Sequence, residues 1–182
     1  MSKRALILVD IQNDYFPGGK WTLSGIEPAT ANAARLLEAA RAKDELVVHV
    51  RHEAAKPDAP FFVAGTPGAE INPGVANRAG EQVVVKNFPN SFRDTGLKKL
   101  LDDAGVTDVL IAGAMSHMCI EVTTRAAADF GYVVTVAHDA AATRDLEFGG
   151  ITVPAAQVHA AAMASLAFGY AKLASTDELL AG

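Results

Sequence analysis

Residues 108–120, DVLIAGAMSHMCI, join an apolar run of strand length to a helical segment and contain the only cysteine of the chain, Cys119. Glu121 to Phe130 follow with apolar side chains at helical spacing. Backbone N–H groups in the first turn of a helix lack intrahelical partners, and the helix dipole is positive there. Such a position stabilises a thiolate, so the sequence predicts that the pKa of Cys119 falls below about 8.5. The alternative is a buried structural cysteine, because cysteine packs like a small apolar residue.

Further apolar runs alternate with helical segments along the whole chain. Strands are expected at 5–9, 46–50, 82–86, 108–112, 132–137 and 170–173. Helices are expected from Pro28 onward and at 97–104, 121–130, 153–168 and 177–180. This alternation is typical of a parallel sheet with right-handed crossovers. We therefore predict an α/β fold with three α/β/α layers around a six-stranded parallel sheet.

The composition favours a single domain over residues 1–182, with no disulfide or metal needed to stabilise its core. The net charge is -5 and no block of lysine or arginine is present, which argues against nucleic acid and anionic membranes as partners. One cysteine cannot form an internal disulfide. The apolar run after Lys3-Arg4 is too short for a signal peptide or a membrane span. We expect a cytoplasmic protein.

Charged residues stand at the ends of two further expected strands. Asp10 directly follows the first strand, and Lys86 ends the third. Ligand sites in open α/β sheets form at the carboxyl ends of strands. Each residue also has a structural interpretation, because aspartate caps turns and most lysines are solvated. Of the two nearby aspartates, Asp14 is the one that we expect in a turn.

Asp10, Lys86 and Cys119 together provide the groups that a cysteine hydrolase reaction needs. A thiolate attacks a carbonyl carbon, and a carboxylate takes the thiol proton and returns it to a leaving amine. An ammonium group places the carboxylate and favours an anionic sulfur. Backbone N–H groups at Cys119 and in the preceding turn can receive the oxyanion. His117 is predicted to line the pocket rather than to act as the base.

Residues 54–80 form a long segment with little periodicity and four prolines. Loops of this length within a domain are usually functional. We predict that the segment covers the site, with Phe61 or Phe62 as an apolar wall. Alternatively, both side chains fix the loop to the body or fill a subunit interface.

Three ordered motifs resemble the isochorismatase-like cysteine hydrolases, a superfamily that includes nicotinamidases, N-carbamoylsarcosine amidohydrolases and isochorismatases. They are LVDIQNDYF at 8–16, Val85-Lys86 with Ser91-Phe92, and GAMSHMCI at 113–120 with TTRAA at 123–127. The resemblance extends from about residue 5 to residue 168 and is specific at the level of the superfamily.

The resemblance implies the isochorismatase-like fold and a catalytic triad. In that triad Asp10 is the base, Lys86 its partner and Cys119 the nucleophile. It also implies a non-proline cis peptide between Ala114 and Met115. This bond would turn the Met115 N–H toward the oxyanion, beside the N–H of Cys119.

One departure from the family pattern bears on cofactors. Nicotinamidases carry Arg-Asp-Trp-His after the second strand as part of a metal site, whereas this chain has Arg51-His52-Glu53-Ala54. We therefore predict no metal and no cofactor. His52 and Glu53 then either line the pocket or form a salt bridge at its rim.

The sequence thus predicts a cysteine amidohydrolase that cleaves a small primary amide, carbamoyl or related C–N substrate. Vinyl ether hydrolysis of the isochorismatase type is one alternative, and a catalytically silent binding protein on the same fold is another. The expected partners are a small-molecule substrate and further copies of the chain, in a homo-oligomer (dimer or tetramer). The residues predicted to line the pocket are Phe16, His52, Phe61, Phe62, Ser91 and His117.

Overall fold

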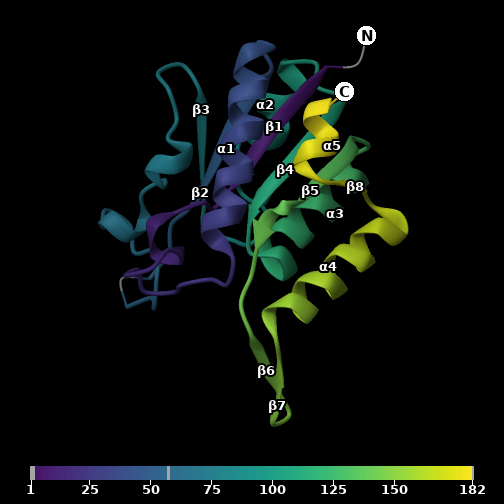
Figure 1. Ribbon diagram of the computed structural model, residues 1–182. Coiled ribbons are helices and arrows are strands. Elements are labelled where there is room, and N and C mark those ends of the chain that lie inside the picture. Colours follow the sequence, from purple (N-terminus) through teal and green to yellow (C-terminus); the bar gives the residue numbers. More distant parts are fainter. Residues whose placement is uncertain (1–2, 57, 182) are drawn as a thin grey trace.

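Six parallel strands form the central sheet of the protein, in the order β3-β2-β1-β4-β5-β8 (Figure 1). The computed structural model describes residues 3–56 and 58–181. The strands of this sheet are β1 (Arg4–Val9), β2 (Leu46–His52), β3 (Gln82–Lys86), β4 (Asp108–Ala114), β5 (Val133–Ala142) and β8 (Lys172–Ala174). The helices are α1 (Ile26–Ala42), α2 (Leu97–Asp103), α3 (Glu121–Asp129), α4 (Ala155–Gly169) and α5 (Thr176–Ala181). The α/β fold with a six-stranded parallel sheet is confirmed.

Helices cover both faces of the sheet, which gives the three predicted layers. Alternate side chains of a strand point to opposite faces. Leu6 and Leu8 of β1 therefore pack with Leu36 and Leu37 of α1 on one face, where α5 also lies. Ala5, Ile7 and Val9 belong to the second core cluster, on the face covered by α2, α3 and α4. Since both faces are covered, the central strands β1 and β4 are buried and apolar along most of their length, as expected for a parallel sheet.

Gly113 allows the two central strands to come close together. Its φ is +129°, and a Cβ at this position would lie 2.0 Å from the carbonyl oxygen of Val9. A residue with a side chain therefore could not occupy this point without moving β1 away from β4. These are the two strands between which the strand order changes direction, where ligands bind in open α/β sheets.

Two helices begin two residues away from the position expected from the sequence, and the other helix boundaries agree to within one residue. Helix α1 begins at Ile26, two residues before Pro28. Proline is tolerated in the first turn because the N–H that it lacks would have no intrahelical partner there. Helix α4 begins at Ala155 because Val153 pairs in a strand instead.

An antiparallel hairpin of β6 (Leu146–Phe148) and β7 (Ile151–Val153) was not expected from the sequence. Gly149 and Gly150 form its turn with positive φ angles of 59° and 79°. The hairpin extends away from the sheet beside the start of α4 (Figure 1). Three-residue strands offer too little apolar periodicity to be found in a sequence.

The segment after β2 is an ordered loop fixed to the residues that follow β1. It contains two short 3-10 helices, Pro67–Ala69 and Pro73–Val75. The N–H of Asn13 donates to Glu70 O at 3.1 Å, and the N–H of Asn72 donates to Ile11 O at 2.9 Å.

Of the helices in the described ranges, none is long and apolar enough to cross a membrane.

Candidate active site

Asp10, Lys86 and Cys119 meet at the carboxyl edge of the sheet. Asp10 follows β1, Lys86 ends β3, and Cys119 lies in a π-helical turn, Ser116–Ile120, between β4 and α3. Because β2 lies between β3 and β1, the Lys86 side chain has to cross two interstrand spacings, roughly 10 Å. Only a long side chain can do this, which explains a lysine at the end of β3.

The three side chains are in contact and almost completely buried. Lys86 Nζ lies 2.7 Å from Asp10 Oδ2 and 3.3 Å from Cys119 Sγ. The exposed fractions are 0% for Asp10, 1% for Lys86 and 6% for Cys119. The structure thus brings together the three residues that the sequence predicted as a triad.

The predicted fall in the pKa of Cys119 is wrong for the resting site. Burial raises the pKa of the thiol, and the negative charge of Asp10 raises it further, whereas Lys86 opposes the rise. The helix-terminus argument failed because it treated the sulfur as partly solvated. Burial would by itself lower the pKa of Lys86, but Asp10 and Cys119 outweigh it and the net shift is upward. Burial and Asp10 thus favour the neutral form of the Cys119 thiol, and Asp10 favours the charged form of Lys86.

Asp10 is arranged to exchange a proton. Among the described residues, no donor makes a directed hydrogen bond to either of its carboxylate oxygens, although Lys86 forms an ion pair with one of them. The backbone of Asp10 has φ 53°, a left-handed conformation that non-glycine residues seldom adopt. Unusual backbone conformations of this kind cluster at functional sites.

The turn that carries Cys119 folds back on the end of β4. The peptide bond between Ala114 and Met115 is cis. The N–H groups of Met118 and Ile120 both donate to the carbonyl oxygen of Met115. The Ser116 hydroxyl lies 3.2 Å from Ala142 O and 2.8 Å from His159 Nδ1, which ties the turn to β5 and α4.

The aromatic residues of the long loop lie next to the triad. Phe62 is 1% exposed, and its ring centroid lies 4.5 Å from that of Tyr15 and 6.0 Å from that of His52. Phe61 packs between Phe62 and Trp21, with centroid distances of 4.9 Å and 4.8 Å. These contacts fix the loop to the body beside His52.

The other predicted pocket residues lie in different surroundings. Phe16 is half-buried against the aromatic cluster. The Ser91 hydroxyl contacts Thr123 Oγ1 at 2.8 Å, so it connects the loop after β3 to α3. His117 Nδ1 lies 2.7 Å from Thr143 Oγ1. Glu53 forms a salt bridge with Arg51 at 2.6 Å, and neither residue lines the cavity beside the Cys119 turn.

Of two buried polar residues after β1, Gln12 was not assigned a role from the sequence and Asp14 was expected only in a turn. Gln12 is fully buried and holds the backbone of His52: its Oε1 accepts from His52 N at 2.8 Å, and its Nε2 donates to His52 O at 2.9 Å. The carboxylate of Asp14 accepts from Phe62 N at 2.7 Å, so this residue anchors the covering loop. Their position in a polar run directly after a buried strand was the only available signal.

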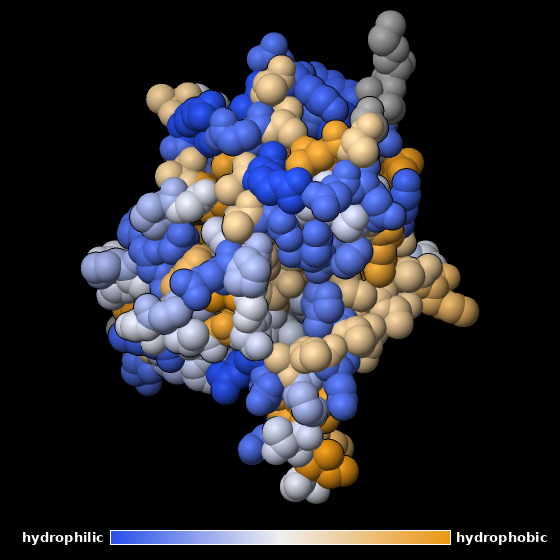
Figure 2. All heavy atoms as spheres, viewed as in Figure 1, coloured by the Kyte–Doolittle hydropathy of each residue, from blue (hydrophilic) through white to orange (hydrophobic). Residues whose placement is uncertain are grey.

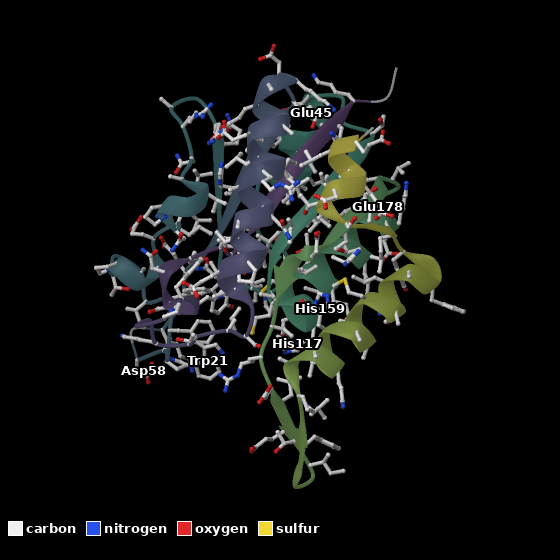
Figure 3. All side chains as sticks on the ribbon, in the orientation of Figure 1. Trp21, Glu45, Asp58, His117, His159 and Glu178 are labelled. Atoms are coloured by element: carbon white, nitrogen blue, oxygen red, sulfur yellow. The ribbon has the colours of Figure 1, made fainter. Side chains whose placement is uncertain are left out.

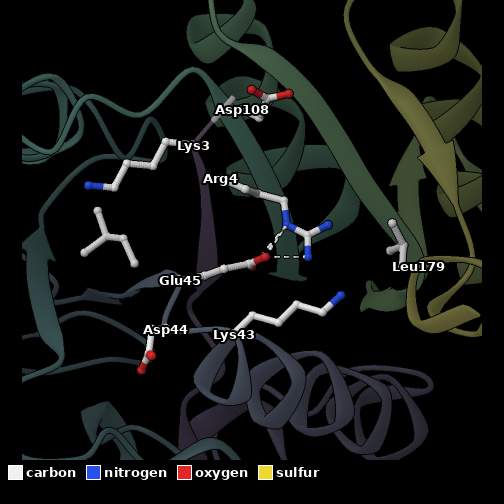
Figure 4. A pocket seen from close by; sticks show the side chains of 8 residues that line it. Lys3, Arg4, Lys43, Asp44, Glu45, Asp108 and Leu179 are labelled. Atoms are coloured by element: carbon white, nitrogen blue, oxygen red, sulfur yellow. Dashed lines mark hydrogen bonds and ion pairs between the residues drawn. The ribbon is translucent and has the colours of Figure 1, made fainter. Parts of the chain in front are cut away.

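A cavity of about 470 Å³ adjoins the Cys119 turn. Met115, His117 and Met118 of the turn line it together with Trp21 and Arg144, and Figure 3 labels His117 and Trp21. A second cavity, of about 540 Å³, lies at the other end of the sheet, where Arg4 and Glu45 form an ion pair at 2.9 Å (Figure 4). Of these two, the first lies beside the turn that carries Cys119, and its volume suits a small substrate.

Asp10, His52 and Cys119 offer three ligand atoms that lie within 4.8 Å of one another. Lys86 Nζ, however, lies 2.7 Å from Asp10, 3.0 Å from His52 Nδ1 and 3.3 Å from Cys119. A metal ion bound by the three would have to share this space with the positive charge of Lys86. The residues present therefore do not fit a metal centre while Lys86 is in place.

A comparison with protein families matches an isochorismatase domain to residues 4–178. The chain belongs to the isochorismatase family. The crystal structure named for an isochorismatase hydrolase from Oleispira antarctica superposes with a TM-score of 0.96 at 57% identity, over 100% of this chain and 97% of that chain. The isochorismatase family protein YddQ of Bacillus subtilis is 44% identical over 97% of this chain and 98% of its own length.

Several relatives have names that state their chemistry, and one of them is an amidohydrolase. The maleamate amidohydrolase of Pseudomonas putida is 31% identical over 78% of this chain and 73% of its own length. Members of the isochorismatase family are hydrolases, and amidases are among them. The protein described here is accordingly a hydrolase of this family.

Proposed function

We propose that the protein is a cysteine hydrolase that cleaves the C–N bond of a small amide or carbamoyl compound through a thioester on Cys119. The observation that carries the proposal is the contact of Lys86 Nζ with both Asp10, at 2.7 Å, and Cys119, at 3.3 Å. A covalent mechanism needs a nucleophile, a base and a charge that holds them together. The maleamate amidohydrolase among the relatives supports an amide as the substrate class.

In the first half of the reaction, Asp10 takes the proton of the Cys119 thiol as the sulfur attacks the carbonyl carbon. Transfer during attack suits a thiol whose pKa is raised by burial, because no free thiolate has to form beforehand. The N–H groups of Met115 and Cys119 receive the oxyanion. Asp10 then gives its proton to the leaving nitrogen, and ammonia or an amine departs.

In the second half, water hydrolyses the thioester. Asp10 takes a proton from the water molecule while the oxygen of that water attacks the carbonyl carbon of the thioester. The C–S bond breaks, Asp10 returns the proton to the sulfur, and a carboxylic acid leaves. Lys86 remains charged throughout, so it keeps Asp10 in position and compensates the negative charge that moves between carboxylate and sulfur.

A hydrolysis screen tests this function. Small primary amides, carbamoyl compounds and isochorismate are offered to the wild type and to Cys119→Ala, and each product is quantified. We expect amide or carbamoyl turnover that depends on Cys119, and hydroxamate formation when hydroxylamine is added. No turnover of any C–N substrate, or turnover that survives Cys119→Ala, would contradict the proposal.

Vinyl ether hydrolysis of the isochorismatase type is the second candidate, favoured by the family domain that matches the chain. It requires acid catalysis by Asp10 but no covalent bond to sulfur. Turnover of isochorismate that Asp10→Asn abolishes and Cys119→Ala preserves would establish this reading in place of the first.

We also propose that the protein forms a homo-oligomer. Helix α4 carries no charged residue between Ala155 and Gly169, and Phe168 is 95% exposed on it. Phe148 at the tip of the hairpin is 87% exposed, and Figure 2 shows apolar colour at this tip and along α4. Light scattering is expected to give the mass of a dimer or tetramer, and the mass of a monomer at micromolar concentration would contradict it.

A further inference from the structure

We propose that His52 is a positioning residue: its Nδ1 accepts a hydrogen bond from Lys86, so that the ammonium group is held between Asp10 and Cys119. This inference rests on the proposed function for its catalytic meaning, but its structural content can be tested without a substrate. His52 was expected to line the pocket or to take part in a rim salt bridge, neither of which involves Lys86.

Lys86 Nζ lies close to three groups: it forms an ion pair with Asp10 and contacts His52 and Cys119. The distances are 2.7 Å to Asp10 Oδ2, 3.0 Å to His52 Nδ1 and 3.3 Å to Cys119 Sγ. A lysine ammonium is a donor of three hydrogens and accepts none. The ammonium group can therefore donate to His52 Nδ1 and to Cys119 Sγ while its charge is balanced by Asp10.

This contact fixes the protonation state of His52. Because Lys86 can only donate, Nδ1 must carry a lone pair, and the single ring proton of a neutral imidazole resides on Nε2. The electrostatic surroundings agree: burial lowers the pKa of His52, and the positive charge of Lys86 lowers it further, against the opposing charge of Asp10. Lys86 and Asp10, with Cys119 beside them, are the titratable groups that face the ring from the other elements.

The rest of the structure holds the His52 ring in this orientation. His52 ends β2 and pairs in register with Lys86 on β3, so the two side chains start from neighbouring backbone positions. The buried amide of Gln12 clamps both the N–H and the C=O of His52. The ring of Phe62 lies 6.0 Å from the imidazole, and Phe62 is itself held by Asp14.

The length of the Lys86 side chain explains why a second contact is needed to hold its ammonium group. Its four-carbon stem spans the end of β2 and has several rotatable bonds, so an ion pair with Asp10 alone would leave the ammonium free to move away from the sulfur. A neutral acceptor on β2 limits that movement without adding a charge that would compete with Asp10. Loss of groups that orient the ligands of a bound metal typically costs about 10- to 100-fold in affinity or activity, and we expect an effect of the same order for a group that orients Lys86.

The first test is spectroscopic and needs no substrate. Protein labelled with ¹⁵N-histidine is examined by NMR near neutral pH, and the His52 resonances are assigned by their loss in His52→Asn. We expect an unprotonated Nδ1 and a protonated Nε2. A proton on Nδ1, or a doubly protonated ring, would overturn the proposal whatever the enzyme hydrolyses.

The second test compares two substitutions of His52. Asparagine places an acceptor oxygen near the position of Nδ1, whereas leucine has a similar size and no acceptor. We expect His52→Leu to slow iodoacetamide alkylation of Cys119 and to lower kcat by about 10- to 100-fold with little change in KM. His52→Asn should restore most of both losses. Equal behaviour of the two variants would refute the role of the acceptor.

His49→Leu is the matched control, because His49 is a second buried histidine on β2 that contacts Glu81 instead of Lys86. It should leave the alkylation rate of Cys119 unchanged. If alkylation slows equally in His49→Leu and His52→Leu, the effect comes from the packing of β2 and the positioning role is wrong. If NMR shows the expected tautomer of His52 but the protein hydrolyses no amide, the proposed function is rejected and the positioning role of His52 is not.

Discussion

Two ionic clusters occupy opposite ends of the β2–β3 pair, and they differ in how their carboxylates are hydrogen-bonded. At the amino end, Glu81 accepts from both Arg41 Nε and Nη2, at 2.6 Å and 2.8 Å, from Arg78 N at 2.7 Å, and contacts His49 Nε2 at 3.0 Å. At the carboxyl end, Asp10 is more deeply buried, yet its oxygens receive no directed hydrogen bond from the described residues.

The difference distinguishes a structural carboxylate from a reactive one. A carboxylate with all its lone pairs engaged stabilises the fold and has no capacity left for a proton. The hydrogen bonds from Arg41 lower the pKa of Glu81 to about 2, so this group stays ionised. Asp10 has its charge balanced by Lys86 and its lone pairs available, which is the condition for a group that moves a proton between sulfur, nitrogen and water.

The largest expected effect is the loss of activity when the carboxyl-end cluster is altered. Cys119→Ala, Asp10→Asn and Lys86→Ala should each reduce kcat/KM by about 10⁴-fold or more, and double variants should be little worse than the worst single one, because the groups act as a unit. Glu81→Gln should remain within about threefold of the wild type when measured below its unfolding temperature. Additive losses in the double variants would show that the three groups act independently.

The second prediction concerns the thiol. Since burial and Asp10 raise the pKa of Cys119 and Lys86 opposes the rise, iodoacetamide alkylation of the wild type should follow a pH profile displaced above that of a model thiol. Asp10→Asn removes a negative charge beside the sulfur and should move the profile to lower pH while turnover is lost. Lys86→Met should move it to higher pH. A wild-type profile below that of the model thiol would restore the helix-terminus argument.

The third prediction concerns stability at the amino-end cluster. Glu81→Gln should destabilise the fold by about 2 kcal/mol, since it weakens charge-assisted hydrogen bonds. The pKa of Glu81 is lowered from 4.5 to about 2 on folding, so its ionic contribution is fully present above pH 4.5 and is lost as pH falls to 2. Denaturant unfolding should therefore show that the difference between wild type and Glu81→Gln shrinks across that window.

Glu70→Gln provides the matched control for this measurement. The Glu70 carboxylate pairs with Arg51 at 3.2 Å but is 56% exposed, and exposed pairs contribute little to stability. If Glu70→Gln and Glu81→Gln lower the free energy of unfolding equally, the hydrogen bonds of Glu81 do not give it a larger contribution to stability than an exposed ion pair.

The smallest expected effect is that of a chelator. Because Lys86 provides the positive charge at the site, EDTA should leave both the activity and the thiol alkylation profile unchanged, and elemental analysis should find no stoichiometric zinc, iron or manganese. One metal per chain, removed together with activity, would show that Asp10, His52 and Cys119 bind an ion despite the lysine.

Much of the fold and the three central residues could be predicted from the sequence. Strand and helix patterns are local: apolar runs such as 5–9 and 108–112 record burial on both faces of the sheet. Charged residues directly after such runs mark the carboxyl edge, so Asp10 and Lys86 could be assigned before their contact was known. The short hairpin at 146–153 escaped because its strands have only three residues each.

Only the tertiary structure decided which groups touch and in what state. The sheet order places β2 between β3 and β1, so Lys86 crosses the end of β2 and meets His52, a relation that no local pattern contains. The clamp of Gln12 on His52 joins residues forty positions apart. The raised pKa of Cys119 depends on complete burial beside Asp10. Spacing along a chain records periodicity and turns, whereas solvation and long-range neighbours are fixed only when the sheet is assembled.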